Sequence, residues 1–416
     1  MSTVLKSGTL IDGKGNPPVE NISVVIEGDK ITAVERENKV AIPSDATIID
    51  AAGMTIMPGL IDAHVHLTGN RTMDPSKWVN EPPELRTIRA AADLKTFLDW
   101  GFTSVRDLGS SDGIFLRNAV NEGTIPGPRI VTAYKLISQT AGHGDIHFVP
   151  EAWLKEIDGS SIIADGVDEC RKAVRWLNRA GADCIKICTT GGGGSEKDGP
   201  HQPQFTIEEI KAMTEEAHRV GKKVASHAQG LEGIRNAITG GVDTIEHGTY
   251  IDDECCEVLA KSNKIMVPTL VNVKLYVTLG AKSGMPDYAL KKANESIKYK
   301  AGAIKRARSH GVKLALGSDT SGAYPARHGL NNVKSLQYYV EDCGMSPMEA
   351  IVSATENAAE ALDRSNLVGT VESGKLADLI VVEGNPAKDI TVLCNQDAIK
   401  MVMKGGNICV DRGIAK

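Results

Sequence analysis

The chain has 416 residues, of which 41% are hydrophobic and 24% charged, so it is long enough to bury a large core. Its net charge of -6 argues against a nucleic-acid-binding surface, and no apolar run approaches the ~18 residues of a membrane span. The N-terminus lacks an apolar signal region, and the eight cysteines form no CxxC pair, which favours reduced thiols. We therefore expect a cytoplasmic protein without a membrane or nucleic-acid partner.

The two ends of the chain have the same pattern of short strands and turns. In ISVVIEGDKITAV, a Gly-Asp turn separates two β-rich runs, as is typical of a β-hairpin. Near the other end, ADLIVVEG predicts a strand and IKMVMKGGNICV predicts a second hairpin with Gly-Gly at its turn. The sequence thus predicts one small β-sandwich domain formed by residues 1–56 and 366–416, with residues 57–365 inserted between its halves.

The middle of the chain alternates strands and helices, which is typical of parallel α/β proteins. Helical segments such as EEIKAMTEEAHRVG and GLEGIRNAITGG end at glycine. The candidate strands are HVHL, FTSVRDL, RIVTAYKL, DCIKICT, KVASHA, DTIEHG, IMVPTLV and KLALGSD. Eight such strands predict a closed (β/α)8 TIM barrel. Three longer polar segments, at about 68–86, 138–165 and 272–300, are predicted to be functional loops or lids.

Five potential metal ligands follow predicted strands. His64 and His66 lie on one face of LIDAHVHL, because side chains alternate along a strand. His227 follows KVAS, His247 follows DTIE and Asp319 follows LALGS. Barrel enzymes place their chemistry at the carboxyl ends of the strands, and imidazole with carboxylate suits zinc. The HxH pair alone could be held by hydroxyl or backbone groups, but the whole set predicts a metal site.

Lys186, in CIKICTTGGGG, is expected to point inward on the same face as Cys184 and Cys188. An ammonium group would be repelled by metal ions. The lysine therefore either pairs with an inward carboxylate or has reacted with CO2 to form a carboxylated amine, which could bridge two ions. The glycines Gly191–Gly194 lack a phosphate-binding motif and instead predict a close approach of the backbone to the site.

These motifs resemble the amidohydrolase superfamily over essentially the whole chain, including PGLIDAHVHL and the split β-domain. HVHL, IKICTTGG, SHAQG, IEHGTY and GSDT are most similar to the branch of Xaa-Pro dipeptidases and imidazolonepropionase-like proteins. The resemblance implies two divalent ions, expected to be zinc. It places one ion on His64, His66 and Asp319 and the other on His227 and His247, with carboxylated Lys186 as the bridge.

The resemblance also implies a mechanism, in which a hydroxide bridging the two metals attacks the scissile carbonyl. Asp319 is predicted to carry the proton from water to the leaving amine. His143, in SQTAGHGD, is predicted to polarise the carbonyl, although it could also be an exposed loop histidine. Gln229 is expected to face the cavity because it is two residues beyond His227. Other candidates for substrate binding at the rim are Tyr250, Tyr324, Arg327 and His328.

The leading hypothesis is a binuclear metallopeptidase that cleaves the amide bond of dipeptides or N-acyl amino acids. It is expected to be a homo-oligomer with this small molecule as its partner. The alternative is a hydrolase of a cyclic or xenobiotic amide, ester or carbamate. A non-catalytic scaffold of the same fold is a remote third reading, because it predicts broken ligands and all six are present. Imidazolonepropionase and deaminase chemistry needs no lysine bridge, so Lys186 argues against both.

Overall fold

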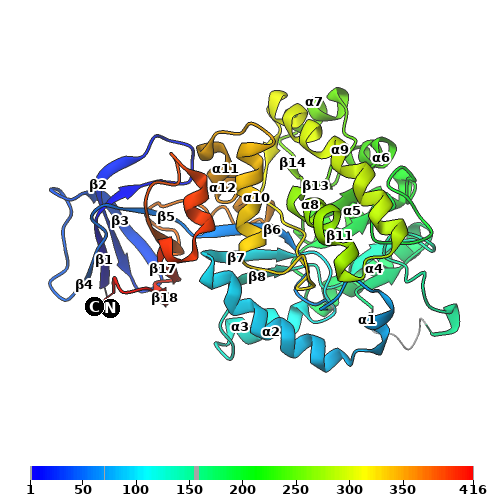
Figure 1. Cartoon of the computed structure of the whole chain (residues 1–416), viewed down its shortest axis with the longest axis horizontal. Coiled ribbons are helices and arrows are strands. Elements are labelled where there is room, and N and C mark those ends of the chain that lie inside the picture. Colours follow the sequence, from blue (N-terminus) through cyan, green and yellow to red (C-terminus); the bar gives the residue numbers. More distant parts are fainter. Residues whose placement is uncertain (1, 70, 154–158, 416) are drawn as a thin grey trace.

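The computed structural model of the chain describes residues 2–69, 71–153 and 159–415. Figure 1 shows a β-rich end, which carries strands from both ends of the chain, beside a larger α/β part. The predicted α/β class with an additional β-domain is confirmed. Among the described residues, no helix combines the length and apolar character needed to cross a membrane.

The β-rich end is one eight-stranded sheet with the order β18-β17-β16-β5-β1-β2-β3, in which β4 lies beside β1. Both hairpins expected from the sequence are present, with their turns at residues 28–29 and 405–406. The strands are β1 (Ser2–Leu10), β2 (Val19–Glu27), β3 (Lys30–Arg36), β4 (Thr47–Asp50), β5 (Met54–Pro58), β16 (Leu379–Glu383), β17 (Ile399–Lys404) and β18 (Asn407–Asp411).

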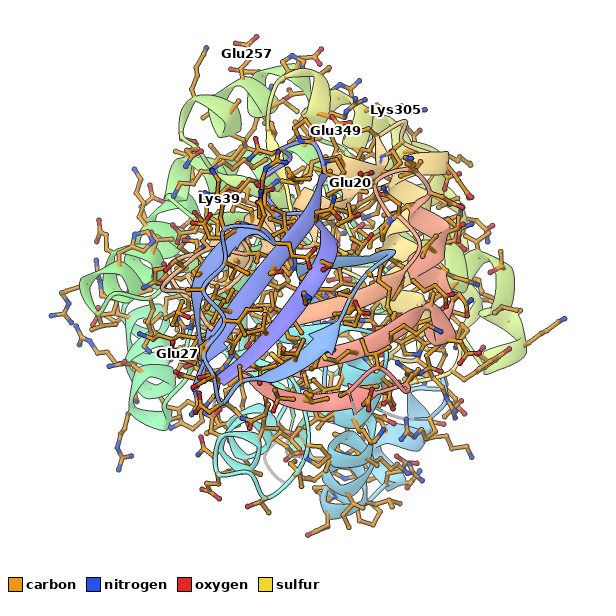
Figure 2. The ribbon with its side chains drawn as sticks, turned by 90° about the vertical axis from the view of Figure 1, so that its left-hand side faces the viewer. Glu20, Glu27, Lys39, Glu257, Lys305 and Glu349 are labelled. Atoms are coloured by element: carbon orange, nitrogen blue, oxygen red, sulfur yellow. The ribbon has the colours of Figure 1, made fainter. Side chains whose placement is uncertain are left out.

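This sheet curves back on itself around one apolar core. The Ile31 amide donates to the Lys375 carbonyl at 2.9 Å, so β3 also meets the segment before β16. Ile26 from β2, Ile56 from β5 and Met401 from β17 pack in the same buried cluster. Figure 2, which views the molecule from this end, shows charged side chains on the outer surface. The hydrogen bonds therefore form a single curved sheet instead of the two separate sheets of a sandwich.

The α/β part contains two parallel sheets, with the orders β10-β9-β11-β12-β13-β14-β15 and β6-β7-β8. The strands are β6 (Leu60–Val65), β7 (Phe102–Asp107), β8 (Arg129–Thr132), β9 (Leu136–Ser138), β10 (Ser161–Ile163), β11 (Ile185–Cys188), β12 (Val224–Ala228), β13 (Thr244–His247), β14 (Ile265–Val267) and β15 (Lys313–Leu314).

Among the residues that the structure describes, the two parallel sheets do not merge into one closed ladder. Strand β15 has only two residues, and the chain after it meets β6 through separate backbone bonds. The Ala63 amide donates to the Leu316 carbonyl at 2.8 Å, and the Asp319 amide donates to the His64 carbonyl at 2.7 Å. At the other junction, the Asp183 amide donates to the Thr132 carbonyl at 2.7 Å. These contacts bring β6 and residue 319 together, although the described part of the chain has no regular strand pairing that closes the ring.

Helices flank the parallel strands. Helix α4 buries Cys170, Ala173, Val174 and Leu177, the spacing of an amphipathic face, and ends at left-handed Gly181. The helices are α1 (Ser76–Asn80), α2 (Pro83–Asp99), α3 (Gly113–Asn121), α4 (Val167–Ala180), α5 (Ile207–Arg219), α6 (Leu231–Gly240), α7 (Asp253–Lys261), α8 (Leu270–Leu279), α9 (Asp287–Ser309), α10 (Leu330–Glu341), α11 (Pro347–Ser353) and α12 (Glu356–Ala361). Short 3-10 turns are η1 (Glu151–Trp153), η2 (Ala281–Ser283), η3 (Ile390–Cys394) and η4 (Gln396–Ala398).

The three segments predicted to be long loops differ in how much regular secondary structure they contain. The prediction is wrong for residues 272–300, which lie mainly in helices α8 and α9 with the short turn η2 between them. Segment 68–86 contains α1 and the start of α2. Segment 138–165 contains η1 and β10, and its residues 154–158 lie outside the described residues. Helices α8 and α9 stand over the ends of the strands, where they form part of the wall of the cavity described next.

Candidate metal centre

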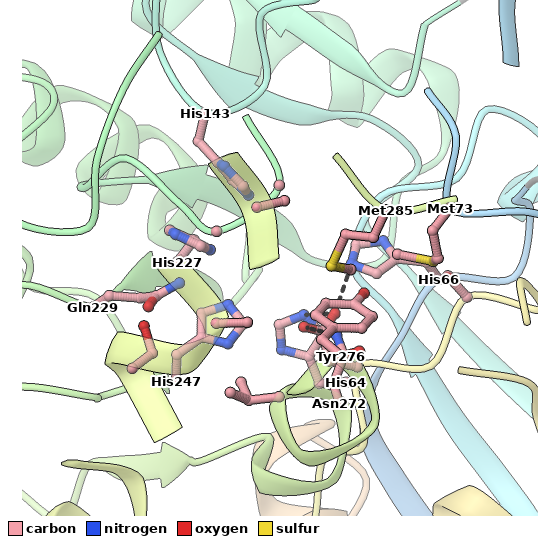
Figure 3. A pocket seen from close by; sticks show the side chains of 18 of the residues that line it. His64, His66, Met73, His143, His227, Gln229, His247, Asn272, Tyr276 and Met285 are labelled. Atoms are coloured by element: carbon pink, nitrogen blue, oxygen red, sulfur yellow. Dashed lines mark hydrogen bonds and ion pairs between the residues drawn. The ribbon is translucent and has the colours of Figure 1, made fainter. Parts of the chain in front are cut away.

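A cavity of about 250 Å³ lies at the carboxyl ends of the parallel strands. Figure 3 shows His143, His227, His247 and His64 around it, with Gln229 beside His227. All six side chains expected to bind metal line this cavity: His64, His66, Lys186, His227, His247 and Asp319. Side chains from separate strands are thus brought to one space, as in enzymes that carry their chemistry at strand ends.

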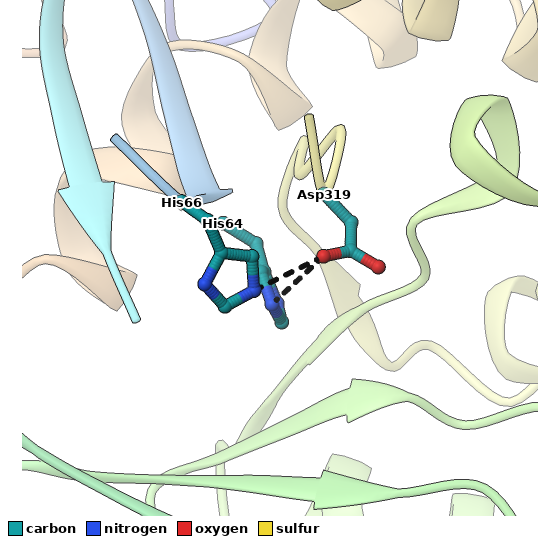
Figure 4. A group of neighbouring side chains, drawn as sticks. All are labelled: His64, His66 and Asp319. Carbon is teal, nitrogen blue, oxygen red and sulfur yellow. Dashed lines mark ion pairs between the residues drawn. The ribbon is translucent and has the colours of Figure 1, made fainter. Parts of the chain in front are cut away.

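Three of these residues form a group suited to a metal ion. Ligand atoms of His64, His66 and Asp319 all lie within 4.8 Å of one another. Oδ1 of Asp319 lies 3.3 Å from Nε2 of His66 and 3.6 Å from Nε2 of His64, as Figure 4 shows. Burial raises the pKa of Asp319, but the two histidines outweigh it and hold that pKa well below its usual range. The carboxylate is therefore ionised and can serve as a metal ligand.

The histidine rings are oriented by hydrogen bonds on the nitrogen that faces away from the group. Nδ1 of His64 lies 2.7 Å from Oε2 of Glu246, and Nδ1 of His66 lies 3.0 Å from the carbonyl of Gly109. Nδ1 of His247 lies 2.7 Å from the hydroxyl of Thr269. The carboxylate of Glu246 and the carbonyl of Gly109 can only accept, so they favour Nδ1–H in His64 and His66 and leave the Nε2 lone pairs of these two rings free for a metal.

His227 has the opposite arrangement. Its Nε2 lies 3.2 Å from the carbonyl of Gly191, so its Nδ1 is the nitrogen left with a lone pair. The rings of His227 and His247 are 4.4 Å apart, and those of His64 and His247 are 5.1 Å apart. The four histidines therefore form one continuous cluster.

A buried ion pair between Glu246 and Arg106 contacts this cluster through His64. Glu246, on β13, accepts hydrogen bonds from His64 and from Nη2 of Arg106, on β7, at 2.8 Å. Burial raises the pKa of Glu246, but Arg106 and His64 outweigh it and lower the pKa to about 2. Nε of Arg106 also donates to the Ala63 carbonyl at 2.7 Å. The charge of Arg106 thus stabilises the carboxylate that orients His64.

Lys186 is the least ordinary member of the set. Its side chain is 2% exposed, and its Nζ makes no hydrogen bond or ion pair with any residue that the structure describes. Burial lowers the pKa of this amine, which favours the neutral form that reacts with CO2. The flanking Cys184 and Cys188 are buried, and burial raises the pKa of both thiols to about 12, so thiolate ligands are disfavoured.

The two other cavity residues expected from the sequence also lie here. The ring of His143 stacks on that of His227 at 4.0 Å, with 23° between their planes. Burial lowers the pKa of His143 to about 4, whereas the charge of Asp198 acts in the opposite direction. Gln229 lines the cavity, and its Oε1 accepts a hydrogen bond from the hydroxyl of Thr249 at 3.3 Å.

Four of the predicted substrate contacts lie elsewhere, outside the lining of this cavity. Tyr250 packs against the ring of Tyr299 at 4.9 Å in a neighbouring depression. Tyr324 and Arg327 are exposed. His328 is buried, with its Nδ1 2.7 Å from the hydroxyl of Thr320. The role of these four residues in substrate binding stays a prediction that no contact with the cavity supports.

Helices α8 and α9 add residues that the sequence reading missed. Asn272 donates from Nδ2 to Oδ2 of Asp319 at 2.7 Å. Lys300 donates to the Pro268 carbonyl at 2.9 Å and lies 3.4 Å from the hydroxyl of Thr269. Tyr276, on α8, and Met285, just before α9, add apolar surface to the cavity wall. The sequence pattern of residues 272–300 predicts a loop and singles out none of these positions.

Strained backbone occurs at the same place. His247 has a φ of 72°, Thr269 of 48° and Asp319 of 58°, in the left-handed region that residues other than glycine seldom adopt. Such strain commonly gathers at functional sites, where the surrounding structure stabilises it. Two proposed ligands and one residue that orients a ligand are therefore held in unusual conformations.

Comparison with known proteins finds relatives that agree with the family indicated by the motifs. The Amidohydrolase family matches residues 55–409. An ochratoxinase from Aspergillus niger is 34% identical over 99% of this chain and 87% of its own. A prolidase solved with N-methylphosphonate-L-proline is 32% identical, with a TM-score of 0.90 over 99% of this chain and all of the other. A Xaa-Pro dipeptidase with bound methionine is 35% identical, with a TM-score of 0.85 over 98% of this chain and 99% of its own. The resemblance noted in the motifs is confirmed.

Proposed function

The chain belongs to the amidohydrolase family, and we propose that it is a binuclear metal-dependent hydrolase of dipeptides or N-acyl amino acids. One observation carries the binuclear assignment. A buried lysine amine without a hydrogen-bond partner among the described residues lines the same cavity as four histidines and an aspartate. A bare ammonium in that position would be costly, whereas a carboxylated amine would be a bridging ligand.

The donor set fits two divalent ions, which we propose to be zinc. His64, His66 and Asp319 would hold the first ion, since their ligand atoms already lie within 4.8 Å of one another. His227 and His247 would hold the second. Lys186, carboxylated by CO2, would be a ligand of both ions. We further propose that the two parallel sheets act as one (β/α)8 barrel, with residues 1–56 and 366–416 as a separate β-domain.

The bound ions would supply an activated water molecule and polarise the scissile carbonyl. The protein's own part begins with Asp319, whose Oδ2 is held by the Asn272 amide at 2.7 Å. We propose that Asp319 takes a proton from the attacking water and passes it to the leaving nitrogen. His143, which lines the cavity beside His227, would polarise the carbonyl oxygen as charge develops on it.

The substrate class is supported by the relatives and by the lining of the cavity. The structures of the prolidase and the Xaa-Pro dipeptidase hold a proline derivative and methionine, respectively. In this chain Gln229 offers a neutral amide to the cavity. We therefore propose substrates whose C-terminal side chain is uncharged. Roles in substrate binding for Tyr250, Tyr324, Arg327 and His328 would require substrate to reach beyond this cavity.

A second candidate is hydrolysis of a cyclic or xenobiotic amide, ester or carbamate. The similarity to the ochratoxinase, which covers 99% of this chain, favours this candidate. The side chains of Met73 and Met285 and the ring of Tyr276 in the cavity wall would suit an aromatic or aliphatic group. The same catalytic groups would serve both classes, so substrate identity alone separates them. A homo-oligomeric state and a cytoplasmic location belong to the same proposal.

The test is a substrate panel with zinc-loaded protein, containing dipeptides, N-acyl amino acids, a lactam, an aryl ester and a carbamate. We expect the highest kcat/KM for a dipeptide or an N-acyl amino acid with an apolar C-terminal residue. Lys186→Met, which removes the amine but keeps an unbranched chain, should abolish hydrolysis. Lys211→Met, at an exposed position of α5, should not. Preference for the lactam, ester or carbamate would favour the second candidate, and full activity of Lys186→Met would contradict the binuclear assignment.

A further inference from the structure

A chain of hydrogen bonds holds the ring of His143 through its Nδ1. Nδ1 of His143 lies 3.1 Å from the hydroxyl of Ser195, and that hydroxyl makes a short hydrogen bond to Oδ1 of Asp198. Neither Ser195 nor Asp198 belongs to the predicted metal or substrate set. We propose that Ser195 and Asp198 are positioning residues that fix the orientation and tautomer of His143 for the hydrolysis proposed above, on which this role rests.

The buried carboxylate of Asp198 decides which group donates in each of these hydrogen bonds. Asp198 is 7% exposed, and its Oδ2 accepts from Nε2 of Gln204 at 3.0 Å. A carboxylate can only accept, so the Ser195 hydroxyl must donate its single hydrogen to Asp198. Ser195 can then only accept from His143. His143 therefore carries a hydrogen on Nδ1, and its Nε2 is the nitrogen left for a reacting group.

The ring also has two close neighbours. It stacks on His227 at 4.0 Å. It also lies against the backbone of Gly192, where an added Cβ would come within 2.2 Å of Cε1 and Nδ1 of His143. A side chain at position 192 would displace the ring. This contact gives the glycine run after β11 a specific purpose, since it forms one wall of the slot that holds His143.

Helix α9 secures the loop that carries these residues. Nζ of Lys292 donates to the carbonyls of Gly192 at 3.1 Å and Ser195 at 2.5 Å, and it also donates to the carbonyl of Asp198. The same ammonium lies 3.7 Å from Oδ1 of Asp198. The loop is therefore tied to α9 at three backbone points, which limits its movement relative to the cavity.

The arrangement has a chemical consequence. With Nδ1–H committed to Ser195, Nε2 is the only ring nitrogen of His143 that can contact a substrate. Asp198 lies one hydrogen bond beyond Ser195 and holds that hydroxyl in place. A relay of this kind orients a polar group before the reaction, so its loss should affect turnover more than substrate binding.

The first test reads the tautomer without any substrate. Nitrogen-15 spectra of histidine-labelled, zinc-loaded protein distinguish Nδ1–H from Nε2–H, and the His143→Gln variant assigns the signals. We expect Nδ1–H in the wild type, loss of this preference in Ser195→Ala, and its retention in Ser195→Thr, which restores the hydroxyl. Nε2–H in the neutral wild-type ring, or an unchanged Ser195→Ala spectrum, would overturn the relay.

The second test is kinetic, with the best substrate from the panel. Ser195→Ala and Asp198→Asn should lower kcat by about 10-fold to 100-fold, on the scale of a lost supporting hydrogen bond, with little change in KM. Ser195→Thr should recover most of kcat. Lys197→Gln, in the same loop but exposed and outside the relay, is the control. Unchanged kcat in Ser195→Ala would overturn the positioning role. The spectra decide the tautomer even if the protein hydrolyses none of the compounds.

Discussion

At the scale of single residues, Asp319 has the most demanding position in the cavity. One carboxylate oxygen lies beside Nε2 of His66 at 3.3 Å, and the other accepts from Nδ2 of Asn272 at 2.7 Å. The first oxygen is available to a metal, and the second is placed to take a proton. The proposed mechanism thus assigns metal binding to one oxygen and proton transfer to the other, and replacement by asparagine can separate the two roles.

Asp319→Asn keeps an oxygen ligand but removes the group that can carry a proton. We expect kcat to fall by about 100-fold or more, the usual contribution of a general acid or base, while zinc content stays near that of the wild type. Asp397→Asn, at an exposed position of η4, is the matched control. Elemental analysis of the same samples used for kinetics checks the metal. Near-normal kcat at full metal content would show that another group moves the proton.

Gln229 is expected to set the tolerance for charge at the C-terminal residue of the substrate. It is 8% exposed and lines the cavity two residues beyond His227. Its neutral amide cannot balance a cationic side chain, so the wild type should favour Xaa-Leu over Xaa-Arg. Gln229→Glu should raise kcat/KM for Xaa-Arg relative to that for Xaa-Leu, by an amount equivalent to up to a few kcal/mol.

The control for this change is Gln202→Glu, which introduces the same charge at an exposed position outside the cavity lining. Xaa-Pro dipeptides complete the comparison, because they lack the amide hydrogen of the other substrates. A wild-type preference for Xaa-Arg, or an unchanged ranking in Gln229→Glu, would show that Gln229 does not read the C-terminal residue.

At the scale of elements, the strands beneath the site are joined by one buried guanidinium. Arg106, on β7, donates to Ala63 on β6 at 2.7 Å and to Glu246 on β13 at 2.8 Å. It also donates to the carbonyl of Ala361, the last residue of α12, at 3.1 Å. Three separate strands and one helix are thus connected through a side chain that is 1% exposed. The cavity's geometry depends on this connection.

Arg106→Met should lower the free energy of unfolding by about 3–5 kcal/mol, because it leaves the Glu246 carboxylate buried without its cation. Adding Glu246→Gln should recover part of the loss, since the unpaired charge is removed. Urea denaturation of the single and double variants measures both effects. The control, Arg308→Met, breaks an exposed pair with Glu349 and should cost at most about 1 kcal/mol. Equal losses at the two arginines would contradict the coupling role of Arg106.

The ligands at the strand ends could be predicted from the sequence, whereas the helices that pack around them could not. His64 and His66 follow a two-residue period in an apolar run, so their position could be predicted. Helix α9 buries mainly small residues such as Ala289, Ala293 and Ala303, which give little contrast with its polar side. Its sequence therefore resembles a loop, and the contacts of Asn272 and Lys292 with the site could not be foreseen.

Partners that are distant in the sequence were missed for a different reason. Ser195 and His143 are 52 residues apart, and Arg106 and Glu246 are 140 residues apart. Each looks like an ordinary polar residue in its own segment. Only the packing of β7 against β6 and β13, and of the glycine-rich loop against His143, gives these side chains their roles.

At the scale of the whole molecule, two sheets of different kinds share the chain. The curved β-sheet takes its strands from both ends of the chain, and the parallel strands between them carry the candidate ligands at their carboxyl ends. The antiparallel pairing of β5 with β16 connects the first part of the chain to the last. This pairing lies directly before β6, which carries His64, so the β-rich end fixes the start of the first ligand strand.

A crystal structure of the zinc-loaded protein would show whether a modified lysine bridges a pair of ions. Two anomalous zinc peaks per chain should lie within the cavity, with electron density for a carboxyl group continuous with Nζ of Lys186 and contacting both ions. A single zinc peak at His64, His66 and Asp319, together with a bare Lys186 amine, would contradict the proposed binuclear site.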